Sequence, residues 1–392
     1  MSKSQQRIIA LVDCDCFFVS CERVDNPALC GKAVCVVTNT TNKGIVLSRS
    51  KEAKALSIKM GQPMFQLAGL HPSCHYIPCR HERYGEISKA VMSVLRSFTP
   101  DVEVVSIDEA FMDVTGLNAL YGISYTQLIT NIRAEVLRRT KVPVSIGLCS
   151  SKRLAKLASD KAKETGGIYV IRPTPKTIME KVGDTPIKEV SGIGKQNAKR
   201  LWFNGIGSIR EFVSKDDTWI KKVCGIGGIT LKYELLGKTV SPVNPDPETP
   251  QSIQDTHAFV DFTTDLKFLH TSLLGHIHRA SKKLRAWDGY CGSIAVMLRT
   301  KDFAVFQQEI RLGKPTNSEK TLTAAAHNLL DKLYRKGTIY RASGITLANL
   351  SFGKAQQLSL FDAFEPEDDK LSRTLDLLEN KFGAGVIKRG GM

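Results

Sequence analysis

A proline-rich segment divides this chain into parts that have to fold separately. Within residues 241–252 there are four prolines: Pro242, Pro245, Pro247 and Pro250. Proline removes a backbone donor and fixes φ, so this segment can neither continue a helix nor pair as a central strand. We expect an extended, semi-rigid linker there. The chain has 392 residues, enough for two to four domains with full cores.

Strand and helix signals alternate before the linker. Short apolar runs predict buried strands at 8–12, 33–37, 44–47 and 142–148. Amphipathic periodicity predicts helices at 82–98 and 126–140. This alternation is typical of an α/β domain.

The charge balance favours a polyanionic partner. The chain has 55 Lys and Arg against 39 Asp and Glu, a formal net charge of +16, which points most simply to nucleic acid. No apolar run is long enough to span a membrane, and the N-terminal apolar stretch, which Asp13 interrupts, is shorter than we expect of a signal peptide. We therefore expect a cytoplasmic protein without membrane contact. The ten cysteines contain no CxxC pair and are interpreted as reduced core residues.

Further regions follow along the chain. The glycine turns 192–194 and 225–228 each precede a helical run and resemble helix-hairpin-helix turns, although such turns also join helices in proteins that touch no DNA. After the linker a small α+β module is predicted, with helices at 266–287 and 322–334 and strands at 293–299, 304–312 and 345–350. A tail with the peptide QLSLFD at 357–362 and a helix at 370–381 comes last.

Three carboxylates are the candidates for chemistry. Asp13 follows the first strand, and Asp108 and Glu109 lie between two β-rich arms in EVVSIDEAFMDVT. Adjacent carboxylates repel one another unless a cation holds them. If all three converge, they could bind two Mg²⁺ ions and support nucleotidyl transfer. The residues alone leave another interpretation open, in which Asp13 caps a helix near Cys16 and the acidic pair forms a solvated hairpin tip.

Several lysines could bind a triphosphate. Lys54 lies on a short predicted helix, and Lys152, Lys156 and Lys163 share one face of a later helix. A lysine stripe is more often a solvated face than a ligand site. Its position after the strand 142–148 nevertheless makes a phosphate role plausible.

Five motifs, in order, resemble those of the Y-family DNA polymerases, which are translesion enzymes. They are VDCDCFFVSCE (12–22), SRSKEAKALSIKMG (48–61), YIPCRHERY (76–84), SIDEAFMDVTG (106–116) and SIGLCSSKRLAKLASDKAK (145–163). EAKALSIKMG and QLSLFD are most similar to the UmuC branch, the catalytic subunit of bacterial polymerase V and its plasmid relatives. The resemblance covers about residues 7–362.

The resemblance implies an α+β multidomain fold with right-hand polymerase architecture. The implied domains are a palm, small fingers, a helix-hairpin-helix thumb, a little finger after the linker, and a tail with a clamp-binding peptide. Their expected bounds are 1–22 and 82–172 (palm), 23–81 (fingers), 173–240 (thumb), 241–252 (linker), 253–353 (little finger) and 354–392 (tail).

The resemblance also implies roles for residues at the catalytic site. Asp13, Asp108, Glu109 and the carbonyl of Cys14 would hold two Mg²⁺ ions, and the three carboxylates would be catalytic. The nucleotide-binding residues would be Phe18, as a steric gate against ribonucleotides, together with Ser48, Lys54 and Lys163. Many members of that family have Tyr where this chain has Lys51, so a phenol hydroxyl that could bond the triphosphate is missing here.

Further residues would hold DNA and partners. The implied DNA contacts are Gly192, Gly194, Lys195, Arg279, Lys282, Lys283, Arg285, Arg299 and Lys301. The implied sliding-clamp anchors are Gln357, Leu360 and Phe361. The expected partners are primer-template DNA, dNTP, the clamp, a UmuD-type accessory dimer and a recombinase filament.

The resulting prediction is a template-directed DNA polymerase for error-prone bypass in the SOS response. Two other functions stay open at this point. One is a non-catalytic scaffold that keeps the polymerase fold and binds only DNA or the clamp. The other is a nucleotide cyclase built on a similar palm.

Overall fold

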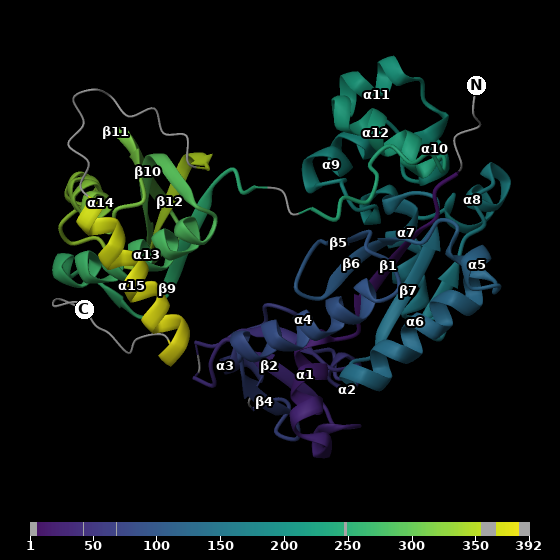
Figure 1. Ribbon diagram of the computed structural model, residues 1–392, viewed down its shortest axis with the longest axis horizontal. Coiled ribbons are helices and arrows are strands. Elements are labelled where there is room, and N and C mark those ends of the chain that lie inside the picture. Colours follow the sequence, from purple (N-terminus) through teal and green to yellow (C-terminus); the bar gives the residue numbers. More distant parts are fainter. Residues whose placement is uncertain (1–5, 42, 68, 247–248, 354–365, 384–392) are drawn as a thin grey trace. The chain divides into compact units, whose positions relative to one another are not determined.

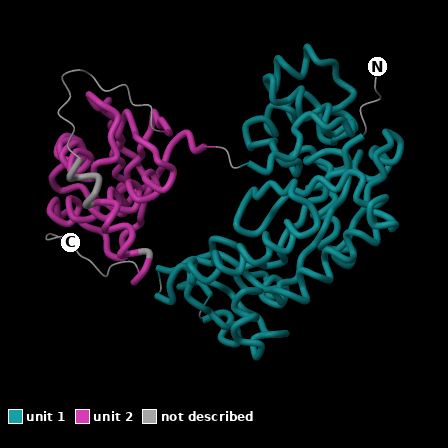
Figure 2. Tube along the Cα trace, in the orientation of Figure 1, with its two compact units in different colours: residues 1–247 teal, residues 248–392 magenta. Residues whose placement is uncertain are grey.

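The computed structural model describes residues 6–41, 43–67, 69–246, 249–353 and 366–383. The chain forms two compact units, residues 1–247 and 248–392 (Figure 2). The division falls within the predicted linker, 241–252, and each unit has a sheet and a core of its own.

The central sheet of the first unit has five strands in the order β5-β6-β1-β7-β8 (Figure 1). β1 lies in the middle and pairs antiparallel with β6 and β7, while β7 pairs parallel with β8. The strand bounds are β1 Ile9–Cys14, β5 Val102–Val104, β6 Glu109–Asp113, β7 Val144–Cys149 and β8 Ile168–Val170. The predicted runs 8–12 and 142–148 thus form adjacent strands.

Helices cover both faces of this sheet, because its strands are apolar on both sides. Ala10 and Val12 of β1 belong to the core that includes α4 (His81–Arg96) and α6 (Tyr125–Thr140). Ile9 and Leu11 instead pack with Ala155 of α7 (Lys152–Ala162). Side chains alternate along a strand, so Asp13 projects from the same face as Ile9 and Leu11, toward α7.

Gly147 of β7 allows α7 to lie directly on the sheet. A Cβ atom at this position would overlap the backbone nitrogen of Ser159 and the backbone oxygen of Ala155. Backbone atoms of a packed helix cannot move aside cheaply. The missing side chain therefore fixes how closely the residues of α7 approach the strands.

Replacing Gly147 with Ala is expected to destabilise the first unit. The added methyl group forces α7 away from β7, and overpacking of this kind costs about 1–3 kcal/mol. Urea denaturation of the variant measures the loss. Gly85→Ala is the matched control, because that glycine lies in α4 with open space around its Cα, and alanine there should add about 0.5–1 kcal/mol. A neutral Gly147→Ala would contradict this packing.

A second, three-stranded sheet in the first unit has the order β3-β2-β4. Its core includes Cys35, Val37 and Val46, with Ile58 and Leu67 from the following segments. The bounds are α1 Phe17–Asp25, β2 Val34–Val37, β3 Val46–Arg49, α2 Lys51–Ala55, α3 Met64–Leu67 and β4 His75–Pro78. β4, which has no apolar run, was not predicted.

The remainder of the first unit is largely helical. The helix bounds are α5 Leu117–Leu120, α8 Pro175–Val182, α9 Lys195–Phe203, α10 Ile209–Ser214, α11 Asp217–Cys224 and α12 Ile226–Leu235. Gly192 and Gly225 have φ values of 100° and 74°, which favour glycine. The second glycine turn is shorter than predicted, since α12 begins at Ile226 and Gly227 and Gly228 lie in its first turn.

The second unit is a four-stranded antiparallel sheet in the order β11-β10-β12-β9. The core between the sheet and helices α13 and α14 includes Ile277, Leu329, Ile294 and Val296. The bounds are β9 Ile253–Thr263, α13 Leu266–Ala286, β10 Gly289–Thr300, β11 Val305–Thr316, α14 Glu319–Leu333, β12 Tyr340–Phe352 and α15 Pro366–Phe382. No helix in the described part of the chain combines the length and apolar character that a membrane span needs.

Candidate active site

Two of the three predicted carboxylates meet through strand register. Asp13 of β1 lies directly opposite Glu109 of β6, and both project from the face that α7 covers. Asp13 is buried, with 6% of its surface exposed. The interpretation of Asp13 as a helix cap is wrong, because the N-cap of α1 is Cys16 and no side chain caps that helix end.

Two lysines of the predicted stripe neutralise these carboxylates. Lys156 Nζ lies 3.0 Å from Asp13 Oδ2 and 2.7 Å from Glu109 Oε2. Lys163 Nζ lies 2.9 Å from the same oxygen of Asp13. Burial disfavours the charge on Lys156, but its contacts with Glu109 and Asp13 raise the pKa of its ammonium group above the usual value. The third lysine, Lys152, pairs with Glu103 instead.

The third carboxylate, Asp108, directly precedes Glu109 in the chain, but its side chain has a different partner. It is in the turn between β5 and β6, and its Oδ1 accepts a hydrogen bond of 2.5 Å from Ser106. The Cys14 backbone N–H donates to the Asp108 carbonyl at 2.8 Å, which ties the turn to the end of β1. The hairpin interpretation therefore describes the position of Asp108, but not that of Glu109.

The donor atoms fit a hard divalent cation in type. Asp13 and Glu109 direct carboxylate oxygens at one point, where the Lys156 ammonium group lies, and such oxygens are the ligands that Mg²⁺ prefers. Across residues 6–383, as far as they are described, no group of three or more His, Cys, Asp or Glu side chains is placed to hold a metal ion. Asp108 uses Oδ1 for its bond with Ser106, which leaves its other carboxylate oxygen as the possible third ligand.

The predicted nucleotide-binding residues lie on separate elements of the first unit. Phe18 is half-buried in the first turn of α1, and its ring stacks on Tyr84 with centroids 4.6 Å apart. Ser48 is buried on β3, and Lys54 is exposed on α2. Of these four residues, Lys163 forms an ion pair with Asp13.

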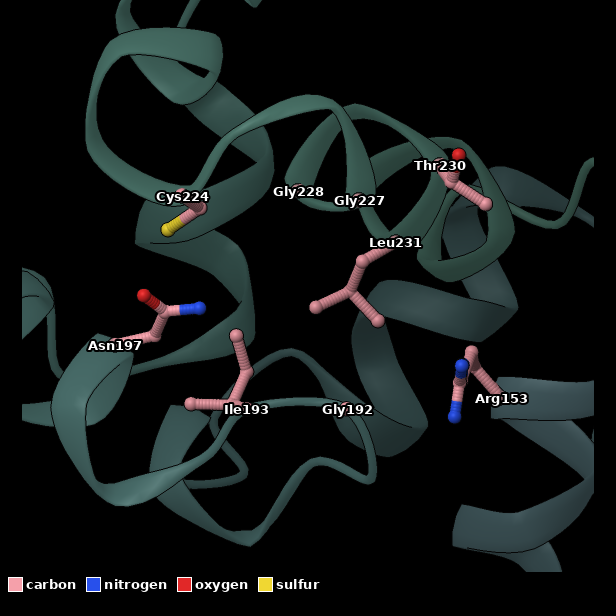
Figure 3. Close-up of a pocket in the computed structure, with 9 residues that line it drawn as sticks. All are labelled: Arg153, Gly192, Ile193, Asn197, Cys224, Gly227, Gly228, Thr230 and Leu231. Atoms are coloured by element: carbon pink, nitrogen blue, oxygen red, sulfur yellow. The ribbon is translucent and has the colours of Figure 1, made fainter. Parts of the chain in front are cut away.

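The glycine turns of the helical region border a cavity of about 250 Å³ (Figure 3). Gly192, Gly194 and Lys195 are exposed at the first turn. Arg153 of α7 reaches the cavity wall, and its Nη1 donates to Ser191 Oγ at 3.2 Å. The lining residues are Arg153, Gly192, Ile193, Asn197, Cys224, Gly227, Gly228, Thr230 and Leu231.

The predicted basic face of α13 is partly neutralised within the second unit. Arg279 and Lys283 have side chains 52% and 60% exposed, and both lie near Asp255, at 2.8 and 3.9 Å. Lys282 is 29% exposed and pairs with Glu379 of α15. Arg279 and Lys283 therefore remain accessible to a polyanion, and Lys282 much less so.

The prediction of Arg285 as a DNA contact is wrong for this structure. Only 3% of its side chain is exposed. Its guanidinium group lies 2.9 Å from Glu319 and 2.6 Å from Asp376, which links α13 to α14 and α15. A side chain buried this deeply does not present its N–H donors to an outside phosphate.

Arg299 lies on a different surface, the open face of the sheet. It neighbours Leu298, which points into the core under α13 and α14, so alternation places Arg299 on the opposite face. Arg311 belongs to the same face, since it pairs with Ser293 in the register of β10 and β11. Arg311 was missed from the sequence, although its alternation with Ile310 and Leu312 was a usable signal. Lys301 is exposed just after β10.

Lys156 was noted on the lysine stripe, but the residues assigned through the resemblance included only Lys163 from that stripe. No sequence signal showed that Lys156 faces both carboxylates, because this contact depends on how α7 packs on the sheet. The clamp anchors Gln357, Leu360 and Phe361 lie outside the described residues.

Comparisons with known proteins agree with this arrangement. Residues 12–160 match the impB/mucB/samB family, and residues 250–360 match the C-terminal domain of that family. Protein ImpB of Salmonella typhimurium is 32% identical, over 97% of this chain and 92% of its own. Protein UmuC of Salmonella typhimurium strain LT2 is 31% identical, over 98% and 93%. A DNA polymerase IV of Desulfatibacillum aliphaticivorans is 30% identical, over 98% and 96%.

Solved structures confirm the fold class. A chimera of the Y-family DNA polymerases Dbh and Dpo4 matches with a TM-score of 0.77 and 27% identity, covering 88% of this chain and 100% of the chimera. An insertion ternary complex of Dbh DNA polymerase matches with a TM-score of 0.57 and the same identity and coverage. The chain therefore belongs to the impB/mucB/samB family, in the UmuC branch of the Y-family DNA polymerases.

Proposed function

We propose that this protein is a template-directed DNA polymerase that performs translesion synthesis by two-metal nucleotidyl transfer. The observation that carries the proposal is the meeting of Asp13 and Glu109 across β1 and β6, with Lys156 and Lys163 beside them. Relatives named DNA polymerase IV and a neighbour that is an insertion complex of a DNA polymerase support the same activity.

The residues have distinct roles in this proposal. Asp13, Glu109, Asp108 and the Cys14 carbonyl would hold Mg²⁺, which would activate a primer hydroxyl and neutralise the triphosphate. Lys163, on the α7 side of Asp13, would contact phosphate oxygens together with Lys54 and Ser48. We assign the five-stranded sheet to the palm, the three-stranded sheet to the fingers, the helical region to the thumb and the sheet of the second unit to the little finger.

DNA would be held without reading of its sequence. The exposed turn at Gly192, Gly194 and Lys195 lies at the start of α9, where free backbone N–H groups favour phosphate. Arg279, Lys283 and Arg299 add exposed positive charge in the second unit. Contacts of this kind make affinity fall steeply with salt.

The proposed biological setting is error-prone bypass in the SOS response, in the cytoplasm. It rests on the similarity to UmuC and on the sequence QLSLFD. Gln357, Leu360 and Phe361 would anchor a sliding clamp, and a UmuD-type dimer and a recombinase filament would be further partners.

Primer extension on an abasic template tests the proposal. We expect nucleotides to be added opposite and beyond the lesion in the presence of Mg²⁺, and no product in EDTA. DNA binding without extension would indicate a scaffold. Cyclic nucleotide formation from ATP, without extension, would indicate a cyclase.

Replacing Phe18 with Ala is expected to increase ribonucleotide use. The ring is held by stacking on Tyr84, so in the proposed role it would press against the position of a 2′-hydroxyl. Removing such a clash is worth about 1–3 kcal/mol, which corresponds to about a 5- to 150-fold change in the ratio of kcat/KM for ribo- and deoxynucleotides. Phe17→Leu, at the buried neighbouring ring, is the control. An unchanged ratio for Phe18→Ala would place the gate elsewhere.

A further inference from the structure

Lys156 contacts both carboxylates of the proposed metal site. Its Nζ is within 3.0 Å of Asp13 and 2.7 Å of Glu109, and its side chain is 24% exposed. The two carboxylate side chains are 9% and 22% exposed. Lys163 is 37% exposed, and of the two carboxylates it contacts only Asp13. Lys156 is thus the shared partner of the two acids.

A divalent cation and this ammonium group are alternative partners for the same oxygens. A cation held by Asp13 and Glu109 would occupy the space beside their carboxylate oxygens, which Lys156 Nζ now contacts. The ammonium group would then be within a few ångströms of a double positive charge. Screening by water is incomplete at this depth, so the two cations repel one another strongly.

A triphosphate provides a new partner for the displaced ammonium group. α7 itself is fixed on the sheet at Gly147, but a lysine side chain is a flexible stem that carries a compact charge. It can turn from carboxylate to phosphate without movement of the helix. Nucleotide binding would then release the carboxylates for the cation.

From this geometry we infer that Lys156 is a positioning residue that makes divalent-cation binding at Asp13 and Glu109 depend on bound nucleotide. The inference rests on the proposed function and deepens it. It means that the polymerase alone binds the cation weakly, and that cation and nucleotide bind with positive cooperativity. Such coupling is reciprocal, so the cation strengthens nucleotide binding by the same factor.

Lys152 offers a matched control on the same helix. It lies one turn before Lys156, is 14% exposed, and pairs with Glu103 at 2.5 Å instead of with the proposed ligands. Removing its charge changes the same helix face without freeing Asp13 or Glu109. Lys156 has one further carboxylate neighbour, Asp160, but at 3.9 Å, so an effect specific to Lys156 is expected to act mainly through the two closer carboxylates.

The test is an electron paramagnetic resonance titration with Mn²⁺, without DNA, on the full chain. It is run on protein alone and with a non-hydrolysable dNTP analogue, after subtraction of Mn²⁺ bound by the analogue. We expect Lys156→Met to bind Mn²⁺ about tenfold more tightly than wild type without nucleotide, a change that corresponds to loss of one competing contact. The effect of the analogue on Mn²⁺ affinity should shrink by the same factor. Lys152→Met should match wild type, and Lys156→Arg should restore wild-type behaviour.

The possible outcomes separate this inference from the proposed function. The inference is overturned if Lys156→Met binds Mn²⁺ no more tightly than wild type does. It is also overturned if the dNTP analogue leaves the Mn²⁺ affinity of the wild-type protein unchanged. Asp13→Asn tests the underlying site: if it binds Mn²⁺ as wild type does, the proposed metal site itself is wrong. If Lys156→Met fails to fold, Lys156→Gln is titrated in its place. The effect of the analogue on the Mn²⁺ affinity of the wild-type protein then provides the second test of the inference.

Discussion

Replacing Asp13 with Asn is expected to abolish primer extension. The amide keeps the size of the side chain but loses the charge that faces Lys156 and Lys163 and would face Mg²⁺. Loss of an essential member of a catalytic group lowers kcat by about a thousandfold or more. Glu109→Gln should have a comparable effect, since Glu109 lies opposite Asp13 in the sheet.

Single-turnover incorporation of one nucleotide measures this loss. Asp101→Asn is the control, because that aspartate is exposed just before β5 of the same sheet and should leave the rate unchanged. Circular dichroism verifies that each variant is folded. If Asp13→Asn kept a tenth of the wild-type rate, the catalytic assignment would be contradicted.

Replacing Arg285 with Ala is expected to destabilise the second unit without removing a DNA contact. The substitution leaves Glu319, which is 5% exposed, without its arginine partner, and also removes the partner of Asp376 on α15. Breaking a buried ion pair on one side costs about 3–5 kcal/mol. Hydrogen exchange of α13 amides in the full chain reports this loss in the second unit.

Arg299→Ala is the matched comparison for DNA binding. Arg299 is exposed on the open face of the sheet, so its loss should leave exchange unchanged, weaken DNA binding and lower the salt slope by about 1. For Arg285→Ala, affinity per folded molecule should match wild type. The reverse pattern, with stable protein and weak DNA binding for Arg285→Ala, would restore the sequence-based prediction.

The elements predicted best are those whose own residues carry the signal. The apolar runs of β1, β2 and β7 and the periodicity of α4, α6 and α13 gave correct elements with small shifts at the ends. β9 was missed because its sequence IQDTHAFVDFT buries only Ile253 and Phe259. A long strand that is exposed along most of its length has no continuous apolar run to detect.

The site residues show the same limit. The motifs identified Asp13 and Glu109, but their contact depends on the register of β1 and β6, which no local pattern reveals. Arg285 was assigned to a surface because its acidic partner Asp376 lies 91 residues further along the chain. A helical wheel shows which residues share a face, but it cannot show that another helix covers that face.

The most direct test of the central claim is the anomalous scattering of Mn²⁺ in crystals with primer-template DNA and a non-hydrolysable dNTP. We expect a peak within ligand distance of both Asp13 and Glu109, with Lys156 Nζ turned toward a phosphate oxygen. A peak bound by other residues, or Lys156 still bridging the two carboxylates beside a bound nucleotide, would contradict it.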